Sequence, residues 1–192
     1  MSLQTKAAGI KLILFDVDGV LTDGRVLIHA DGSESKSFFI RDGIAMVWAE
    51  RVGLRVGLLS ARMSATTVHR AGQLGITLVH QGEVSKLAAY ERILTDLGLH
   101  DEEVAYMGDD VVDLAVLRRA GLSAAPADAV AEVRACVDWV SGPRAADGAA
   151  RDLIELILRA QNRWDGLVAS YMDEPGVPGL LVDARPGRPA SS

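Results

Sequence analysis

Four groups of polar residues in this sequence follow closely after hydrophobic segments. They are Asp16 with Asp18 after residues 12–15, Ser60 after 54–59, Lys86 past 76–80, and Asp109, Asp110 and Asp113 after 104–107. An Asp-x-Asp pair alone is an ordinary polar end of a strand. Each of the four groups is a weak signal by itself. Together, each just past a hydrophobic segment, they predict one site of chemistry.

Such a site needs a scaffold that brings the ends of several strands together. Predicted strands at 12–16, 54–60, 76–80, 104–108, 122–125 and 137–140 alternate with predicted helices at 44–53, 64–75, 83–97, 111–120, 128–136 and 149–163. This alternation predicts an α/β fold, a three-layer Rossmann-like parallel sheet with helices on both faces. In open sheets of this kind the chemistry lies at the carboxyl ends of the strands, near a topological switch point.

Local signals define two of these helices more closely. In the first, four apolar residues recur at helical spacing and predict its buried face: Ile44, Val47, Trp48 and Val52. Gly53 ends that helix, whereas Ser64 caps the start of the next and Gly75 ends it.

Length and composition describe one soluble domain. The 192 residues are 49% hydrophobic and 24% charged, and the net charge of −6 disfavours nucleic acid or an anionic membrane as a partner. There is no apolar run of 18 residues and no signal-peptide pattern, and the single cysteine, Cys136, is predicted to lie in the core. These features predict a cytoplasmic protein. Because four of the six prolines lie beyond residue 170, we expect one domain at 1–170 and a flexible C-terminal tail at 171–192.

The four polar groups resemble the four motifs of haloacid dehalogenase-type phosphohydrolases. Four further segments resemble the capless sugar-acid phosphatases of that family, typified by 3-deoxy-D-manno-octulosonate 8-phosphate phosphatase: FDVDGVLTDG (15–24), FIRDG (39–43), QGEVSK (81–86) and YMGDD (106–110) with the downstream AGLS. The resemblance covers residues 10 to about 163. It implies a Mg²⁺-dependent phosphatase that hydrolyses a phosphorylated sugar acid through an aspartyl-phosphate intermediate.

The resemblance also implies a role for each polar residue. Asp16 attacks phosphorus, and Asp18 protonates the leaving alkoxide and later activates water. Ser60 and Lys86 hold the phosphoryl oxygens. The implied Mg²⁺ ligands are the Asp16 and Asp109 carboxylates and the Asp18 main-chain carbonyl. Asp110 and Asp113 orient Lys86 or a metal-bound water.

Substrate contacts follow from the same resemblance. The implied substrate-binding residues are Arg41, Asp42, Gly43, Arg62, Arg70 and Lys86. Arginine suits a planar carboxylate such as that of a 2-keto acid. Val47 stands where the resembled group usually has arginine, and the loop that begins at Gly142 departs from its usual Gly-Gly-x-Gly. We expect 3-deoxy-D-manno-octulosonate 8-phosphate as the substrate, and a nonulosonic (sialic-type) acid 9-phosphate is the alternative.

Two other classes of protein share parts of this pattern. A receiver domain also takes up phosphate on an aspartate, but receivers lack the second aspartate that Asp18 provides here. A degenerate interaction domain, as associated with some sugar-nucleotide synthetases, is the other alternative. The four intact motifs favour an enzyme over both.

The sequence leaves no room for a cap domain. The segments that separate Asp18, Ser60 and Lys86 hold a hairpin, two helices and a strand at most. Residues 25–40 predict a β-hairpin around Asp31-Gly32, whose strands of about six residues reach roughly 20 Å. Its apolar residues (Val26, Ile28, Phe38 and Ile40) are hard to bury on such a projection. In the resembled group these hairpins pack together and roof neighbouring sites, so we expect a homotetramer with Arg41 and Asp42 close to the shared pocket.

Overall fold

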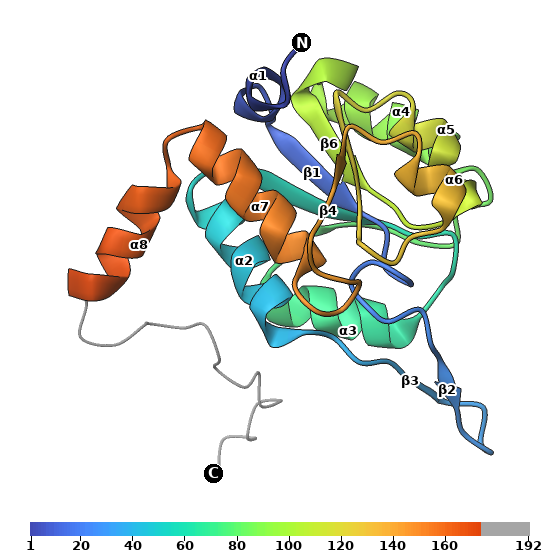
Figure 1. Cartoon of the computed structure of the whole chain (residues 1–192). Coiled ribbons are helices and arrows are strands. Elements are labelled where there is room, and N and C mark those ends of the chain that lie inside the picture. Colours follow the sequence, from blue (N-terminus) through green and yellow to red (C-terminus); the bar gives the residue numbers. More distant parts are fainter. Residues whose placement is uncertain (174–192) are drawn as a thin grey trace.

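A computed structural model describes residues 1–173 and has a six-stranded parallel sheet at its centre (Figure 1). In spatial order the strands are β5 (Leu78–His80), β4 (Arg55–Leu59), β1 (Leu12–Phe15), β6 (Val104–Met107), β7 (Leu122–Ala125) and β8 (Trp139–Val140). The chain builds outward from β1 to β5 and then returns to place β6 on the other side of β1. The topological switch point therefore lies between β1 and β6.

Helices cover both faces of the sheet, which confirms the three-layer α/β fold (Figure 1). They are α1 (Leu3–Ala8), α2 (Ile40–Arg51), α3 (Ala65–Leu74), α4 (Lys86–Leu97), α5 (Leu114–Leu117), α6 (Ala131–Arg134), α7 (Ala149–Ala160) and α8 (Trp164–Asp173), with short 3₁₀ turns at Asp101–Glu103 and Val111–Asp113. As predicted, Ser64 caps α3 and Gly75 ends it in a left-handed conformation. No cap domain interrupts the chain between β1 and β5.

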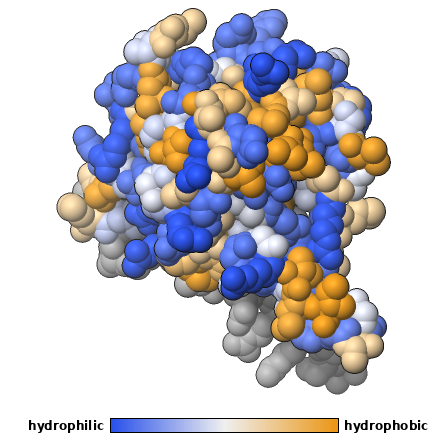
Figure 2. Space-filling view, turned by 45° about the vertical axis from the view of Figure 1, so that its right-hand side comes forward, coloured by the Kyte–Doolittle hydropathy of each residue, from blue (hydrophilic) through white to orange (hydrophobic). Residues whose placement is uncertain are grey.

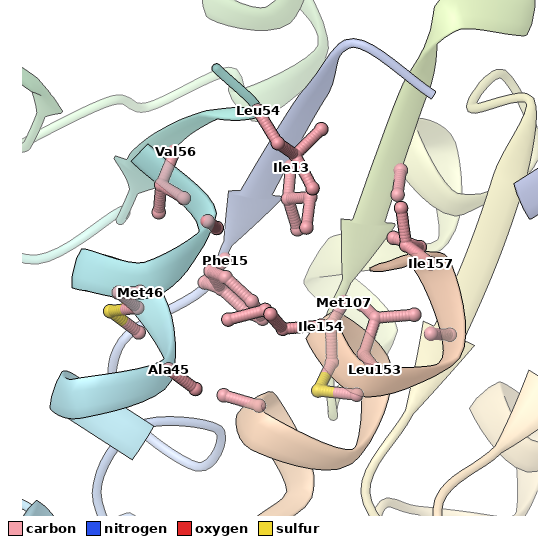
Figure 3. Packing of buried hydrophobic residues seen from close by; sticks show 14 of the residues in the cluster. Ile13, Phe15, Ala45, Met46, Leu54, Val56, Met107, Leu153, Ile154 and Ile157 are labelled. Carbon is pink, nitrogen blue, oxygen red and sulfur yellow. The ribbon is translucent and has the colours of Figure 1, made fainter. Parts of the chain in front are cut away.

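The two cores follow from the alternation of side chains along β1. Ile13 and Phe15 point to one face and pack with residues of α2 and α7, among them Met46 and Ile154 (Figure 3). Leu12 and Leu14 belong to the second core, under α4 and α5. Burial of each such side chain contributes about 1.5–3 kcal/mol. Apolar side chains cover both faces of β1, so the strand is held rigidly where its carboxyl end meets the site.

The buried face of α2 differs from the prediction. Ala45, Met46 and Ala49 are buried, whereas the predicted Ile44, Val47, Trp48 and Val52 are only half-buried. Helix α8, which the sequence patterns did not predict, explains the difference: the Trp48 ring lies 5.8 Å from that of Trp164, measured between centroids. The predicted stripe therefore includes a side chain that faces a neighbouring helix rather than the sheet.

Helix α8 also bears on the expected domain boundary. Trp48 donates a hydrogen bond of 2.7 Å to the hydroxyl of Tyr171, a residue that the expected boundary assigns to the tail. Residues 174–192, the rest of the expected tail, lie outside the described residues. Cys136 is exposed, so its predicted place in the core is wrong. Among residues 1–173, no helix is long and apolar enough to cross a membrane.

The hairpin is present but its strands are shorter than predicted. β2 (Leu27–Ile28) and β3 (Glu34–Ser35) pair only with each other, and the turn carries Gly32 at φ +83°. The hairpin projects from the domain (Figure 1) and bears apolar surface (Figure 2). Leu27 and Ile28 are 62% and 70% exposed. Phe38, expected on the projection, packs instead against the core.

Candidate active site

Pairing of β1 with β6 brings the first and fourth polar groups together. Phe15 pairs with Met107, and the Asp16 amide donates a 3.0 Å hydrogen bond to the Met107 carbonyl. Asp16 and Asp109 therefore leave adjacent strands at the switch point. One carboxylate oxygen from each of Asp16, Asp109 and Asp113 lies within 4.8 Å of the others.

Lys86 stands between two of these carboxylates. Its ammonium lies 3.0 Å from Oδ1 of Asp16 and 2.6 Å from Oδ1 of Asp113. Lys86 is 5% exposed and begins helix α4, for which Ser85 is the N-cap. Burial by itself lowers the pKa of Lys86, but the charges of Asp16 and Asp113 outweigh it and raise the pKa. Lys86 is thus a fixed cation beside the expected nucleophile.

Asp113 is held by four donors and has no exposed surface. Besides Lys86, the Tyr106 hydroxyl donates to its Oδ1 at 2.5 Å, and the amides of Asp109 and Asp110 donate to its Oδ2 at 3.1 and 3.3 Å. The orientation of Lys86 expected for Asp113 is consistent with this geometry. Tyr106 was missed by the sequence analysis, although a tyrosine inside a buried strand signals that its hydroxyl needs a partner.

The carboxylates of Asp16 and Asp109 form an oxygen site with excess negative charge. Burial and the charge of Asp113 raise the pKa of Asp16 to about 6, and burial with the charge of Asp16 raises the pKa of Asp109 to about 8. Oδ1 of Asp109 is buried and accepts no hydrogen bond from the described residues. A Cβ on Gly19 would lie 2.0 Å from the Asp109 carboxylate, so only glycine leaves it room. This donor set fits a hard divalent cation such as Mg²⁺.

Asp18 lies past the same strand end and is paired with a residue that the sequence analysis missed. The Lys36 ammonium lies 2.7 Å from Oδ1 of Asp18 and 2.9 Å from Oδ2. The Lys36 side chain is 1% exposed, and it comes from the segment between the hairpin and α2. No spacing in the sequence signals this pair, because it depends on the path by which the chain returns from the hairpin to α2.

Ser60, the remaining predicted polar residue at a strand end, lies on the other side of β1. It follows β4, is 3% exposed, and its hydroxyl donates to the Arg62 carbonyl at 3.2 Å. Its amide donates to the His80 carbonyl at 2.9 Å, which fixes this loop against β5. The strand order therefore places all four predicted polar groups at one edge of the sheet.

Comparisons with known proteins agree with this geometry. Residues 58–153 match the haloacid dehalogenase-like hydrolases. The 3-deoxy-D-manno-octulosonate 8-phosphate phosphatase KdsC of Salmonella typhi is 37% identical over 163 residues, 85% of this chain and 87% of the relative. The chain belongs to the haloacid dehalogenase-like hydrolase family.

Solved structures of family members show the same fold. The 3-deoxy-D-manno-octulosonate 8-phosphate phosphatase of Yersinia pestis has a TM-score of 0.84 at 36% identity, covering 85% of this chain and 89% of that one. The Moraxella catarrhalis enzyme, in complex with magnesium ion, phosphate ion and KDO, has a TM-score of 0.86 at 35% identity, covering 88% and 97%.

The expected substrate-binding arginines of this hydrolase occupy three different settings. Arg41 is exposed and lies over the Phe39 ring. Arg62 donates to Glu34 of the hairpin at 2.5 Å. Arg70 is half-buried, and burial lowers its pKa. Their contact with substrate stays a prediction.

Asp42 and Gly43, the other residues of that group, have evident structural roles. Asp42 is 2% exposed, and its Oδ1 accepts the amide of Arg151 in the first turn of α7 at 2.9 Å. A Cβ on Gly43 would lie 2.4 Å from the Arg70 guanidinium, so the glycine makes room for that side chain. Asp42 thus ties α2 to α7, and its contact with substrate stays a prediction.

Proposed function

We propose that this hydrolase removes phosphate from 3-deoxy-D-manno-octulosonate 8-phosphate. The observation that carries the proposal is the buried Lys86 ammonium, 3.0 Å from Asp16 and 2.6 Å from Asp113. The ammonium offsets the negative charge of Asp16 and provides a cation that can bind a phosphoryl oxygen. The chain's 37% identity to a phosphatase of this substrate supports the choice of sugar acid.

The first chemical step transfers the phosphoryl group to Asp16. A carboxylate oxygen of Asp16 attacks phosphorus, the bond from phosphorus to the sugar oxygen breaks, and an aspartyl-phosphate forms. Asp18 gives its proton to the departing sugar oxygen. Lys86 and the Ser60 hydroxyl hold the phosphoryl oxygens in line for this transfer.

The second step regenerates the carboxylate. Asp18, now ionised, takes a proton from a water molecule, which attacks phosphorus and releases inorganic phosphate from Asp16. Asp18 thus ends the cycle protonated, ready for the next leaving group. Asp113 and Tyr106 keep Lys86 in place through both steps, because Asp113 is itself held by two backbone amides.

A magnesium ion belongs to this proposal. The Asp16 and Asp109 carboxylates and the Asp18 main-chain carbonyl would hold it, and when bound it would offset the negative charge that phosphate and carboxylates bring together. Asp113 is not assigned as a ligand, because its two oxygens already accept hydrogen bonds from Tyr106, Lys86 and backbone amides.

We also propose that the enzyme acts as a homotetramer in the cytoplasm. The site has no cap, and the hairpin presents Leu27 and Ile28 at 62% and 70% exposure. Exposed apolar side chains on a projecting hairpin are a surface for another subunit. A neighbouring hairpin placed there would supply the missing roof.

A substrate screen tests the sugar assignment. Phosphorylated 2-keto-3-deoxy acids and a nonulosonic acid 9-phosphate would be compared by kcat/KM with Mg²⁺ present, with the Asp16→Asn variant as the inactive control. We expect 3-deoxy-D-manno-octulosonate 8-phosphate to be preferred. Preference for the nonulosonic acid would replace the substrate but keep the chemistry, whereas no turnover of any phosphate ester would refute the proposed function.

A further inference from the structure

Strand β3 and the residue that follows it place two side chains near the site. Glu34 and Lys36 are two residues apart, and side chains at that spacing share one face of an extended segment. Glu34 contacts the loop after β4, and Lys36 contacts Asp18 after β1. A segment outside the four motifs thus contacts two of them.

Lys36 has one carboxylate within ion-pair distance among the described residues. Its ammonium binds both oxygens of Asp18, at 2.7 and 2.9 Å, and only 1% of its side chain is exposed. A buried ammonium is costly unless it is paired, so this contact is an integral part of the folded hairpin stem. The Thr22 hydroxyl lies 3.5 Å from Oδ1 of Asp18 and 3.3 Å from the Val17 carbonyl.

Glu34 in β3 anchors the chain two residues before Lys36. Its two oxygens accept hydrogen bonds of 2.5 Å, one from the Ser64 hydroxyl and one from Arg62. The hydrogen bonds from Ser64 and Arg62 lower the pKa of Glu34, so the anchor stays ionised at neutral pH. Lys36 therefore approaches Asp18 from a position directly after the anchored strand β3.

We propose that Lys36 is a positioning residue for the Asp18 carboxylate, and that the hairpin stem thereby sets the acid–base group of the reaction. This inference rests on the proposed function, in which Asp18 exchanges a proton with the leaving oxygen and with water. A carboxylate on a short side chain still rotates about two bonds. Donation from one ammonium to both oxygens selects one orientation of the ionised group. When one oxygen carries the proton, the other still accepts from Lys36, so the placement is kept while the proton is transferred.

The leaving group provides a test that a merely structural role would not pass. 4-Nitrophenolate is a weak base and leaves without being protonated. Phenolate is more basic, so its departure is faster when an acid protonates its oxygen. For Lys36→Met we expect kcat/KM to fall about tenfold for phenyl phosphate and less than about threefold for 4-nitrophenyl phosphate. Lys36→Arg, which keeps a cationic donor, should restore most of the rate with phenyl phosphate. Lys6→Met removes a lysine paired with Asp138, far from the site in sequence and fold, and serves as the matched control.

A different pattern of losses in Lys36→Met overturns the proposal. Equal losses with both esters would assign Lys36 to phosphate binding or folding, and no loss would remove any role. If Lys36→Met does not fold, as judged by circular dichroism, Lys36→Gln carries the same comparison. Cleavage of aryl phosphates does not require recognition of a sugar acid. A wild-type enzyme that cleaves them but not the octulosonate ester would therefore refute only the proposed substrate. Wild-type inactivity toward every ester would refute the proposed function and the Lys36 role together.

Discussion

The Lys86 ammonium donates a 2.6 Å hydrogen bond to Oδ1 of Asp113, which has no exposed surface. The two residues are 27 positions apart in the sequence and meet only because α4 begins where the loop after β6 turns back. Asp113 in turn accepts a hydrogen bond from Tyr106. The cation beside Asp16 is therefore held by a buried network.

Tyr106→Phe tests that network with the loss of a single hydroxyl. We expect stability to fall by about 1–3 kcal/mol, because Asp113 loses a buried donor. We expect kcat to fall about tenfold, because Lys86 is less well placed. Tyr90→Phe, which alters a second fully buried tyrosine, should change stability without changing kcat. Denaturant unfolding and steady-state kinetics give the two readouts, and an unaltered kcat for Tyr106→Phe would contradict the positioning role.

Asp16→Asn should abolish phosphate release and leave the fold intact. The amide keeps the shape of the side chain but is not a nucleophile toward phosphorus. Asp18→Asn should lower kcat by about 10²–10⁴-fold through loss of proton transfer. Release of inorganic phosphate is the measurement, and the exposed Asp23→Asn is the control. Normal turnover by Asp16→Asn would exclude the aspartyl-phosphate route.

Removal of divalent cations should remove activity. EDTA should stop turnover and added Mg²⁺ should restore it, because the carboxylates of Asp16 and Asp109 would otherwise repel the phosphate. Asp109→Ala should raise the Mg²⁺ concentration that gives half-maximal rate, whereas the exposed Asp96→Ala should not. Full activity in EDTA would be incompatible with this site.

Asp42 should make stability depend on pH. Burial raises its folded pKa to about 6, above the value of 3.8 in an unfolded chain, despite donation from the Arg151 and Gly148 amides. Its stabilising contribution is complete below pH 3.8 and is lost as the pH rises through 6. Relative to Asp42→Asn, the wild type should lose about 1 kcal/mol of unfolding free energy between pH 5 and pH 7. Urea unfolding of both proteins at each pH checks this, and a constant difference would contradict the raised pKa.

Light scattering should give a mass near four times the 20.4 kDa subunit. The double variant Leu27→Ser with Ile28→Ser should dissociate, because it removes the exposed apolar surface of the hairpin. Val140→Ser, on the edge strand β8, is the control. A monomeric wild type that hydrolyses the sugar phosphate efficiently would refute the shared roof.

Much of the fold and the main part of the site could be predicted from the sequence, because the signals were local. Apolar runs such as Leu12–Phe15 define buried strands, and parallel strands place the residues that follow them at one edge. Asp16, Ser60, Lys86 and Asp109 were therefore expected together before any side chain was placed. Ser64 and Gly75 likewise marked the ends of α3 through their own backbone chemistry.

Only the tertiary structure decided which groups hold these residues in place. The pairs Lys36 with Asp18 and Tyr106 with Asp113 join different elements, and the hairpin's path settles the first of them. The same holds for Asp42, whose carboxylate binds the start of α7 rather than facing solvent. Periodicity reports that a position is buried, but a hydrogen-bond partner depends on where two distant segments pack. For that reason the sequence determined the chemistry of this enzyme, and the packing of its hairpin and helices determined how that chemistry is positioned.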